Sequence, residues 1–231
     1  MKDGLNYLLN KYSVPASAVI SEDGGFVTIE GEKYPILPWE SERRIIELYN
    51  MYKSERLGEA CTYRIAHTAK AGTDLFDLLY REVGILTYTV DSPAKEVFAI
   101  AGERTMNCIV ECECGTVATI ELAATLDEGE EDIDKHEMIC EIAVACDRVV
   151  DTQVPQHSVY LFGKEKAKYR DTDAELFGYT ELQASVIRNA FRLASSEEYR
   201  AASLAKHEHI LSVVAAAKKS LETLENVKVG C

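Results

Sequence analysis

The sequence predicts an α+β fold: a largely antiparallel sheet with helices packed on one face and the other face open for oligomerisation. Three stretches of the middle third, Asn107–Cys114, Thr116–Leu122 and His136–Asp147, alternate in polarity at every second residue. That period is typical of strands with one face on a core. We expect the core face to carry Cys108, Val110, Cys112, Cys114, Ala118, Ile120, Leu122, Met138, Cys140, Ile142, Val144 and Cys146. The opposite face would carry carboxylates among smaller residues, with Ile109, Glu111, Glu113, Glu121, Glu137, Ile139, Glu141, Ala143 and Ala145.

Residues 1–40 are predicted to form an N-terminal extension built from a helix and a hairpin. Lys2–Tyr12 places three leucines on one stripe, which is typical of an amphipathic helix. Two short extended runs, Gly25–Ile29 and Lys33–Leu37, are separated by a Glu-Gly-Glu turn. This spacing favours a hairpin.

Residues 41–231 are predicted to form the main α+β domain. A helix is expected over Ser41–Arg56 with Ser41 as its N-cap, followed by a strand over Ala60–His67. A second helix begins near Thr73. After the sheet, apolar stripes predict two closing helices, Glu181–Ala194 and Ala201–Leu224, that pack on the aliphatic face of the sheet.

Composition argues against nucleic-acid and membrane roles. The chain has 231 residues, with 25 basic and 39 acidic side chains, and a net charge of −14. Such a field repels phosphate backbones and anionic lipid. No apolar run approaches the roughly 20 residues that span a bilayer. Because no apolar signal segment follows the first residues, we expect a cytoplasmic protein whose seven cysteines stay reduced.

The clusters that could bind a metal do not have the spacing of a metal site. The acidic loop Asp127–Asp134 lacks the pattern of a calcium loop, so we expect it to be solvated. Cysteines four positions apart on a strand lie about 13 Å from each other, too far to share one ion. His207 and His209 face different sides of a helix, so we expect one in the core and one in solvent. No metal site is predicted.

Several short motifs occur in the order and at the spacing of a known family. They are Arg43–Leu48, Leu57–Ala60, Gly72–Leu79, Cys114–Ile120 and Gly178–Arg188. Together they resemble the C-terminal, substrate-side domain of the Gfo/Idh/MocA oxidoreductases, over roughly residues 43–229. The resemblance implies an antiparallel sheet whose open face associates with a second copy.

The sequence departs from that family at two places that matter for catalysis. The family's enzymes carry an N-terminal Rossmann domain for a nicotinamide cofactor, and the residues before Arg43 are too few to form one. The family's catalytic histidine aligns with Asp74, and an ordinary carboxylate is a weak base near neutral pH. Asp77 matches the family's aspartate, and His67 ends the preceding strand. Asp74, Asp77 and His67 are therefore the candidate pocket residues, although Asp74 also suits a plain helix cap.

These observations lead to two functional hypotheses. The first is a stand-alone, non-catalytic oxidoreductase-like domain, without cofactor, that binds a sugar- or polyol-type ligand or assembles as a homodimer or with a partner. The second is one subunit of a split NAD(P)-dependent sugar or polyol oxidoreductase whose Rossmann domain comes from a partner oxidoreductase chain. Whether the chain is an enzyme stays open at this stage; as an isolated chain we expect it not to be one.

Overall fold

The computed structural model describes residues 1–54, 62–142, 145–153, 158–162, 167–170 and 173–230. Its first elements are α1 (Lys2–Lys11), β1 (Ala18–Ile20), β2 (Phe26–Ile29), β3 (Glu32–Pro35), the 3₁₀ helix η1 (Pro38–Ser41) and α2 (Arg43–Lys53). The middle holds β4 (Thr62–Lys70), α3 (Leu75–Thr89), β5 (Ala94–Ala101), β6 (Thr105–Cys112), β7 (Val117–Leu126), β8 (Ile133–Ile142), β9 (Ala145–Gln153), β10 (Ser158–Phe162) and β11 (Ala167–Arg170). The chain closes with α4 (Glu181–Ser195), α5 (Glu197–Thr223) and β12 (Val227–Lys228).

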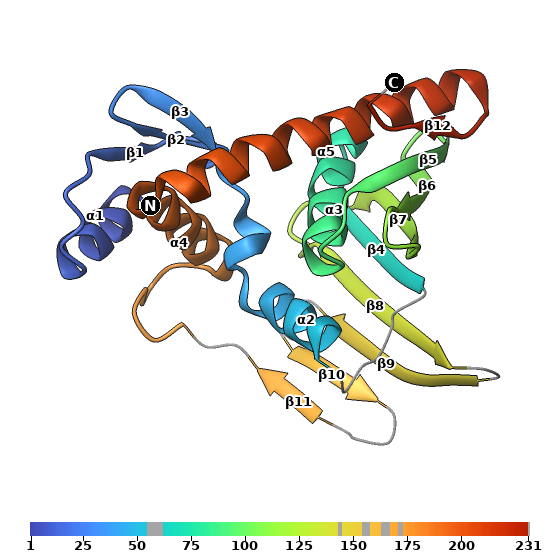
Figure 1. Cartoon of the computed structure of the whole chain (residues 1–231), viewed down its shortest axis with the longest axis horizontal. Helices are drawn as coiled ribbons and strands as arrows, with labels where there is room; N and C mark the ends of the chain where they lie inside the picture. Colours follow the sequence, from blue (N-terminus) through green and yellow to red (C-terminus); the bar gives the residue numbers. More distant parts are fainter. Residues whose placement is uncertain (55–61, 143–144, 154–157, 163–166, 171–172, 231) are drawn as a thin grey trace.

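Within the described residues the main sheet has nine strands in the order β11-β10-β9-β8-β4-β7-β6-β5-β12 (Figure 1). Every neighbouring pair is antiparallel except β4 and β7, which run parallel. The α+β class and the largely antiparallel sheet are thus confirmed. Strands β7 and β8 follow each other in the chain but are not neighbours, because β4 lies between them.

The alternation of the sheet residues is confirmed for β6 and β7 and for the described part of β8. The buried positions are Cys108, Val110, Cys112, Ala118, Ile120, Leu122 and Met138. Cys114 is the exception: it was predicted to face the core but is exposed, because β6 ends at Cys112 and Cys114 lies in the turn before Gly115. The predictions for the side chains of residues 140–147 lie outside the described residues.

Helices α3 and α5 cover the cysteine-bearing face of the sheet. The prediction that both closing helices pack on this face is confirmed for α5 and wrong for α4, which packs on α1, η1 and β2 instead. Helix α5 packs on β5, and α3 packs on β4, β6 and β7. Their contact with the sheet forms the larger hydrophobic core, which includes the fully buried Tyr63, Leu79, Leu86 and Ile120. The opposite face of these strands carries no helix in the described part of the chain.

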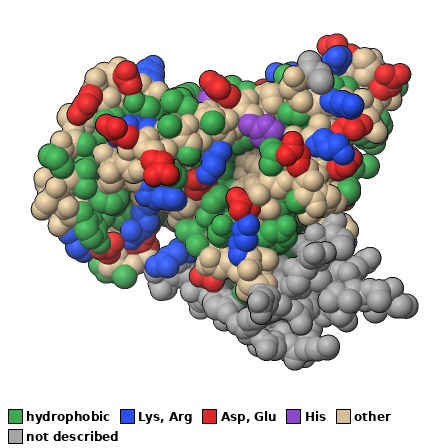
Figure 2. Space-filling model, in the orientation of Figure 1, with side chains coloured by type: hydrophobic (Ala, Val, Ile, Leu, Met, Phe, Trp, Pro, Cys, Tyr) green, Lys and Arg blue, Asp and Glu red, His purple; other side chains and the backbone are tan. Residues whose placement is uncertain are grey.

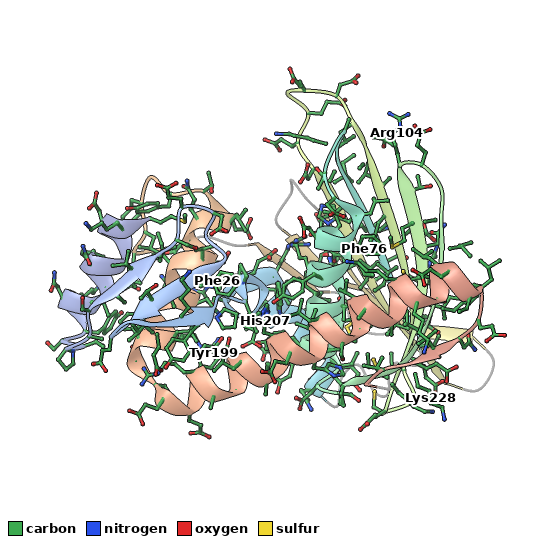
Figure 3. The ribbon with its side chains drawn as sticks, turned by 90° about the horizontal axis from the view of Figure 1, so that it is seen from above. Phe26, Phe76, Arg104, Tyr199, His207 and Lys228 are labelled. Carbon is green, nitrogen blue, oxygen red and sulfur yellow. The ribbon has the colours of Figure 1, made fainter. Side chains whose placement is uncertain are left out.

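A second, smaller core lies at the far end of the molecule, where the N-terminal segment meets α4. It joins residues of α1, such as Leu5 and Leu8, with Val27 of β2 and Ile187 of α4. Helix α5 is 27 residues long, or about 40 Å, so it reaches both cores. Figure 3 shows Tyr199 near the start of this helix and the sheet beside its other end.

Helix starts follow local chemistry. Asp74 caps α3, because its side chain accepts a hydrogen bond from the Phe76 backbone N–H at 2.8 Å. Thr180 and Gln183 form a reciprocal capping box at the start of α4. The prediction of Ser41 as an N-cap is wrong: Pro38 initiates the short η1 helix, Ser41 is its last residue, and α2 begins only at Arg43. None of the described helices combines the length and apolarity needed to cross a lipid bilayer.

Candidate functional site

The structure separates the three predicted pocket residues by burial. Asp74 and Asp77 are exposed in the first turn of α3. His67 faces the core side of β4 and is only 5% exposed. Among the described contacts, none joins His67 to either aspartate, and His67 is bonded instead to Glu82 of α3 at 2.7 Å.

Around His67 lies a buried network of ionisable side chains between the sheet and α3. Two of its carboxylates, Glu82 and Asp134, each use one oxygen for cations or donors and direct the other towards His136. Oε1 of Glu82 accepts from His67 Nδ1 and from Arg81 Nη1 at 2.5 Å. Its second oxygen, Oε2, lies 3.3 Å from His136 Nε2.

Asp134 repeats this arrangement on strand β8. Its Oδ2 receives Arg44 at 2.5 Å and Arg81 at 2.8 Å. Its Oδ1 lies 2.5 Å from His136 Nε2. Glu42 completes the network through ion pairs with both arginines. The acidic loop was predicted to be solvated, and for Asp134 this is wrong: the residue is only 3% exposed because two guanidinium groups neutralise it.

Strand pairing explains why these side chains meet. In the antiparallel β4–β8 ladder, Ile65 pairs with His136 and His67 pairs with Asp134. Helix α3 packs above these strands and places Glu82 next to the two histidines. Glu82 lies on the same stripe of α3 as the apolar Leu79 and Val83. Two sequence signals were available and unused: Glu82 lies on that apolar stripe, and His136 shares the core parity of Met138.

Charge interactions shift the pKa values of Asp134, Glu82 and His67 against the effect of burial. Burial alone would raise the pKa of Asp134, but the adjacent Arg44 and Arg81 hold that pKa well below its usual range. The pKa of Glu82 is likewise lowered by Arg81, against the opposing effect of burial. Burial opposes protonation of His67, yet the hydrogen bond and charge of Glu82 raise the His67 pKa above its ordinary value.

A charge count shows what the network can hold. Glu42, Glu82 and Asp134 contribute three negative charges and the two arginines contribute two positive ones, which leaves one uncompensated negative charge. One proton on a histidine neutralises it. The two carboxylates and two imidazoles, Glu82, Asp134, His67 and His136, are all buried beneath α3.

Three groups of the network lie close enough together to bind a metal ion, but a guanidinium contacts two of them. His67, Glu82 and Asp134 offer ligand atoms within 4.8 Å of one another, which is close enough for a cation. However, Arg81 Nη1 already contacts both carboxylates, at 2.5 and 2.8 Å. The 2.5 Å between His136 Nε2 and Asp134 Oδ1 is also shorter than the distance that two ligands of one ion keep at metal–ligand bonds of about 2.0–2.2 Å. The Arg81 guanidinium thus already supplies positive charge to both carboxylates.

The open face of the sheet is the second candidate site. Phe98, Ile109 and Thr119 are consecutive partners across β5, β6 and β7, and Arg64 and Glu137 continue this row across β4 and β8. Four large aliphatic side chains of these strands are exposed: Ile100 by 48%, Ile109 by 49%, Val117 by 40% and Ile133 by 52%.

Two carboxylates on this face, Glu111 and Glu137, are paired within the chain. Glu111 receives Lys95 at 2.7 Å, and Glu137 receives Lys135 at 2.7 Å and Arg64 at 3.5 Å. An unpaired carboxylate resists burial, but a paired one resists it less. These ion pairs remove one obstacle to covering the face with another protein. On the side of the molecule that Figure 2 shows, which carries the helices, acidic and basic side chains are intermingled.

Comparison with solved structures defines the fold class. The chain has the fold of the C-terminal domain of Gfo/Idh/MocA-type oxidoreductases, so the fold predicted from the resemblance is confirmed. One similar structure is a levoglucosan dehydrogenase in complex with NADH, at 11% identity and a TM-score of 0.66, covering 85% of this chain and 66% of that one.

Two further similar structures span different kinds of protein. A putative oxidoreductase from Thermotoga maritima is 13% identical with a TM-score of 0.59. The match covers 85% of this chain and 63% of the Thermotoga chain. The super-repressor mutant of Gal80p from Saccharomyces cerevisiae is 10% identical with a TM-score of 0.63. That match covers 84% of this chain and 65% of the Gal80p chain. This chain therefore spans about two thirds of these proteins or slightly less. No family model and no curated protein matches its sequence.

Proposed function

We propose that this chain is a non-catalytic, oxidoreductase-like domain that functions by assembly, with the open sheet face packing on a second copy of itself. The observation that carries the proposal is the exposed aliphatic surface on β5, β6 and β7, on the side of the sheet opposite α3 and α5. Buried aliphatic surface is the main source of affinity in such interfaces.

The geometry of the face suits a symmetric contact. In a two-fold interface each copy presents the same patch, so apolar residues at its centre meet their own counterparts. Ile109 lies between Phe98 and Thr119 in the central row of this patch. Stable dimers bury roughly 1,200–2,000 Å² in total, and a sheet face of several strands supplies surface on that scale.

The absence of catalysis is supported by the residue that replaces the family's histidine. Asp74 is exposed and uses its side chain to cap α3 through the Phe76 N–H. A carboxylate in that role is neither desolvated nor positioned as a base. Among the similar structures, one is named as a repressor, so the fold also occurs in a protein named for a function other than oxidation or reduction.

The test is the solution mass of the purified chain and of two matched variants. We expect the unmodified chain to have about twice the mass of one 25.7 kDa protomer by light scattering. Ile109→Lys should lower it to one protomer. The control Leu211→Lys changes an aliphatic residue of α5 with nearly the same exposure, 47% against 49%, and should stay assembled. A single-protomer mass for all three chains would refute assembly with a second copy.

The two other functions predicted from the sequence would give different results in binding experiments. A split NAD(P)-dependent oxidoreductase requires a second chain, so the purified protein would bind a nicotinamide cofactor only after that chain is added. A sugar- or polyol-binding role predicts that calorimetry detects binding of such compounds to the purified chain. Tight binding of NADH by this chain alone would contradict the non-catalytic proposal.

A further inference from the structure

A cavity of about 430 Å³ lies on the helical side of the molecule, away from the buried network and the open sheet face. It is bounded by η1, the second half of α3, the turn before β5, and α5, and its lining includes Trp39, Glu40, Tyr88, Pro93, Lys206 and His209. We propose that this cavity binds a small, uncharged aromatic compound that carries a hydrogen-bond acceptor.

The floor of the cavity is built around the only tryptophan of the chain. The Trp39 indole packs directly on the backbone of α3 at Gly84, where the Cβ of any larger residue would overlap the ring. Tyr80 holds the indole from the side, with ring centroids 5.8 Å apart and planes at 67°. The ring is therefore fixed beside Leu37 and Ile210, which gives the cavity an apolar floor suited to an aromatic ring.

The charged groups of the lining are already paired. Both oxygens of the buried Glu40 carboxylate have donors: Lys206 Nζ at 2.6 Å and the Tyr199 hydroxyl at 2.7 Å. Asp91 pairs with Lys53 at 2.7 Å. An ionic ligand would add a charge with no partner to a partly desolvated site, which is costly. An uncharged ligand avoids that cost.

Two donors at the rim define the polar end of the ligand. Lys206 Nζ has three N–H groups and gives one to Glu40. His209 Nε2 accepts from the Ala94 N–H at 3.0 Å, which places the proton of the neutral ring on Nδ1. Burial supports the neutral form, since it lowers the pKa of His209. A carbonyl oxygen or ring nitrogen on the ligand can accept from these groups.

The fluorescence of Trp39 provides a direct readout, because the chain contains only one tryptophan. The probes are benzamide, which is uncharged, its anionic and cationic counterparts benzoate and benzylamine, and the polyol myo-inositol. We expect benzamide to change the Trp39 emission in a saturable way. Benzoate and benzylamine should bind at least about tenfold more weakly, since each brings an unpaired charge.

Two matched variants locate the binding. Ala205 lines the cavity and is exposed on α5, so Ala205→Phe should fill its mouth and weaken benzamide binding at least about tenfold without touching the core. Ala202→Phe, on the same helix and also exposed but outside the lining, should leave binding unchanged. The proposal is overturned if benzamide does not saturate, if either charged probe or the polyol binds as tightly, or if both variants behave alike.

Discussion

His67 and Glu82 are joined by a hydrogen bond of 2.7 Å between Nδ1 and Oε1, with side chains that are 6% and 0% exposed. One belongs to β4 and the other to α3, so this bond ties the sheet to the helix that covers it. Because the carboxylate also contacts Arg81, the pair is one part of a network that includes Asp134 and His136. Several properties of the protein follow from that network.

The first prediction concerns pH. The His67 pKa is raised in the folded protein, so protonation of His67 stabilises the fold. This contribution is fully present below the pKa of an unfolded histidine, about 6.5, and is lost as pH rises through the folded value. Urea unfolding of the unmodified chain and of His67→Gln should differ most at pH 5.5–6 and progressively less at alkaline pH.

The control is His207, a histidine whose pKa shifts in the opposite direction. His207 is half-buried, bonded to Tyr80 and close to Phe26, as Figure 3 shows, and burial lowers its pKa. His207→Gln should therefore not show a stability difference that grows towards acid pH. If His67→Gln lowers the free energy of unfolding equally from pH 5.5 to pH 9, its proton does not contribute as described.

The second prediction concerns Arg44, whose guanidinium is 3% exposed and bonded to Glu42 and Asp134. Arg44→Met removes the cation and leaves buried carboxylates without compensation, so we expect a loss of about 3–5 kcal/mol in the free energy of unfolding. Adding Asp134→Leu to Arg44→Met should restore part of that loss. A double variant as unstable as the sum of the single variants would show that the two side chains are not coupled.

The third prediction concerns the contact between Trp39 and Gly84. Gly84→Ala introduces a methyl group that overlaps the indole, so we expect a destabilisation of about 1–3 kcal/mol, although alanine is the better helix former. In a chain that already carries Trp39→Leu, Gly84→Ala should lower the free energy of unfolding by less. Chemical unfolding of the unmodified chain, the two single variants and the double variant measures this coupling. A stabilising Gly84→Ala would mean that the indole does not lie on the helix.

The fourth prediction concerns thiol reactivity. Burial raises the pKa of Cys108 and that of Cys112 to about 12, so both should be inert at neutral pH. Burial alone would raise the pKa of Cys114 as well, but hydrogen bonds with Thr116 and Ser92 lower it below its ordinary value. Alkylation at pH 7.5 followed by peptide mass mapping should therefore modify Cys114 much faster than the other two. Equal rates would contradict this assignment.

The parity of the sheet could be predicted from sequence because it is a local property. Cys108, Val110 and Ile120 face the core as their two-residue period indicates. The position of β4 between β7 and β8 could not be predicted, since no local pattern in Thr62–Lys70 specifies which strands lie beside it. Only the assembled sheet brings His67 next to Asp134.

The buried network and the cavity were missed for a related reason. Asp134 belongs to a run of acidic residues, and its burial depends on Arg44, which lies 90 positions earlier. Likewise His207 and His209 were expected to divide between core and solvent, yet each is partly buried and bonded, to Tyr80 and to the Ala94 backbone. Long-range partners of this kind cannot be deduced from charge or helical spacing alone.

The most direct test of the proposed assembly is oxidative footprinting of two matched aliphatic side chains. Ile109 of the open face and Leu211 of α5 are exposed by 49% and 47% in the single chain. With labelling normalised to the unfolded chain, hydroxyl radicals should modify Ile109 much less than Leu211 at high protein concentration, and both equally on dilution. Equal labelling of the two at every concentration would show that the open sheet face does not pack on a second copy.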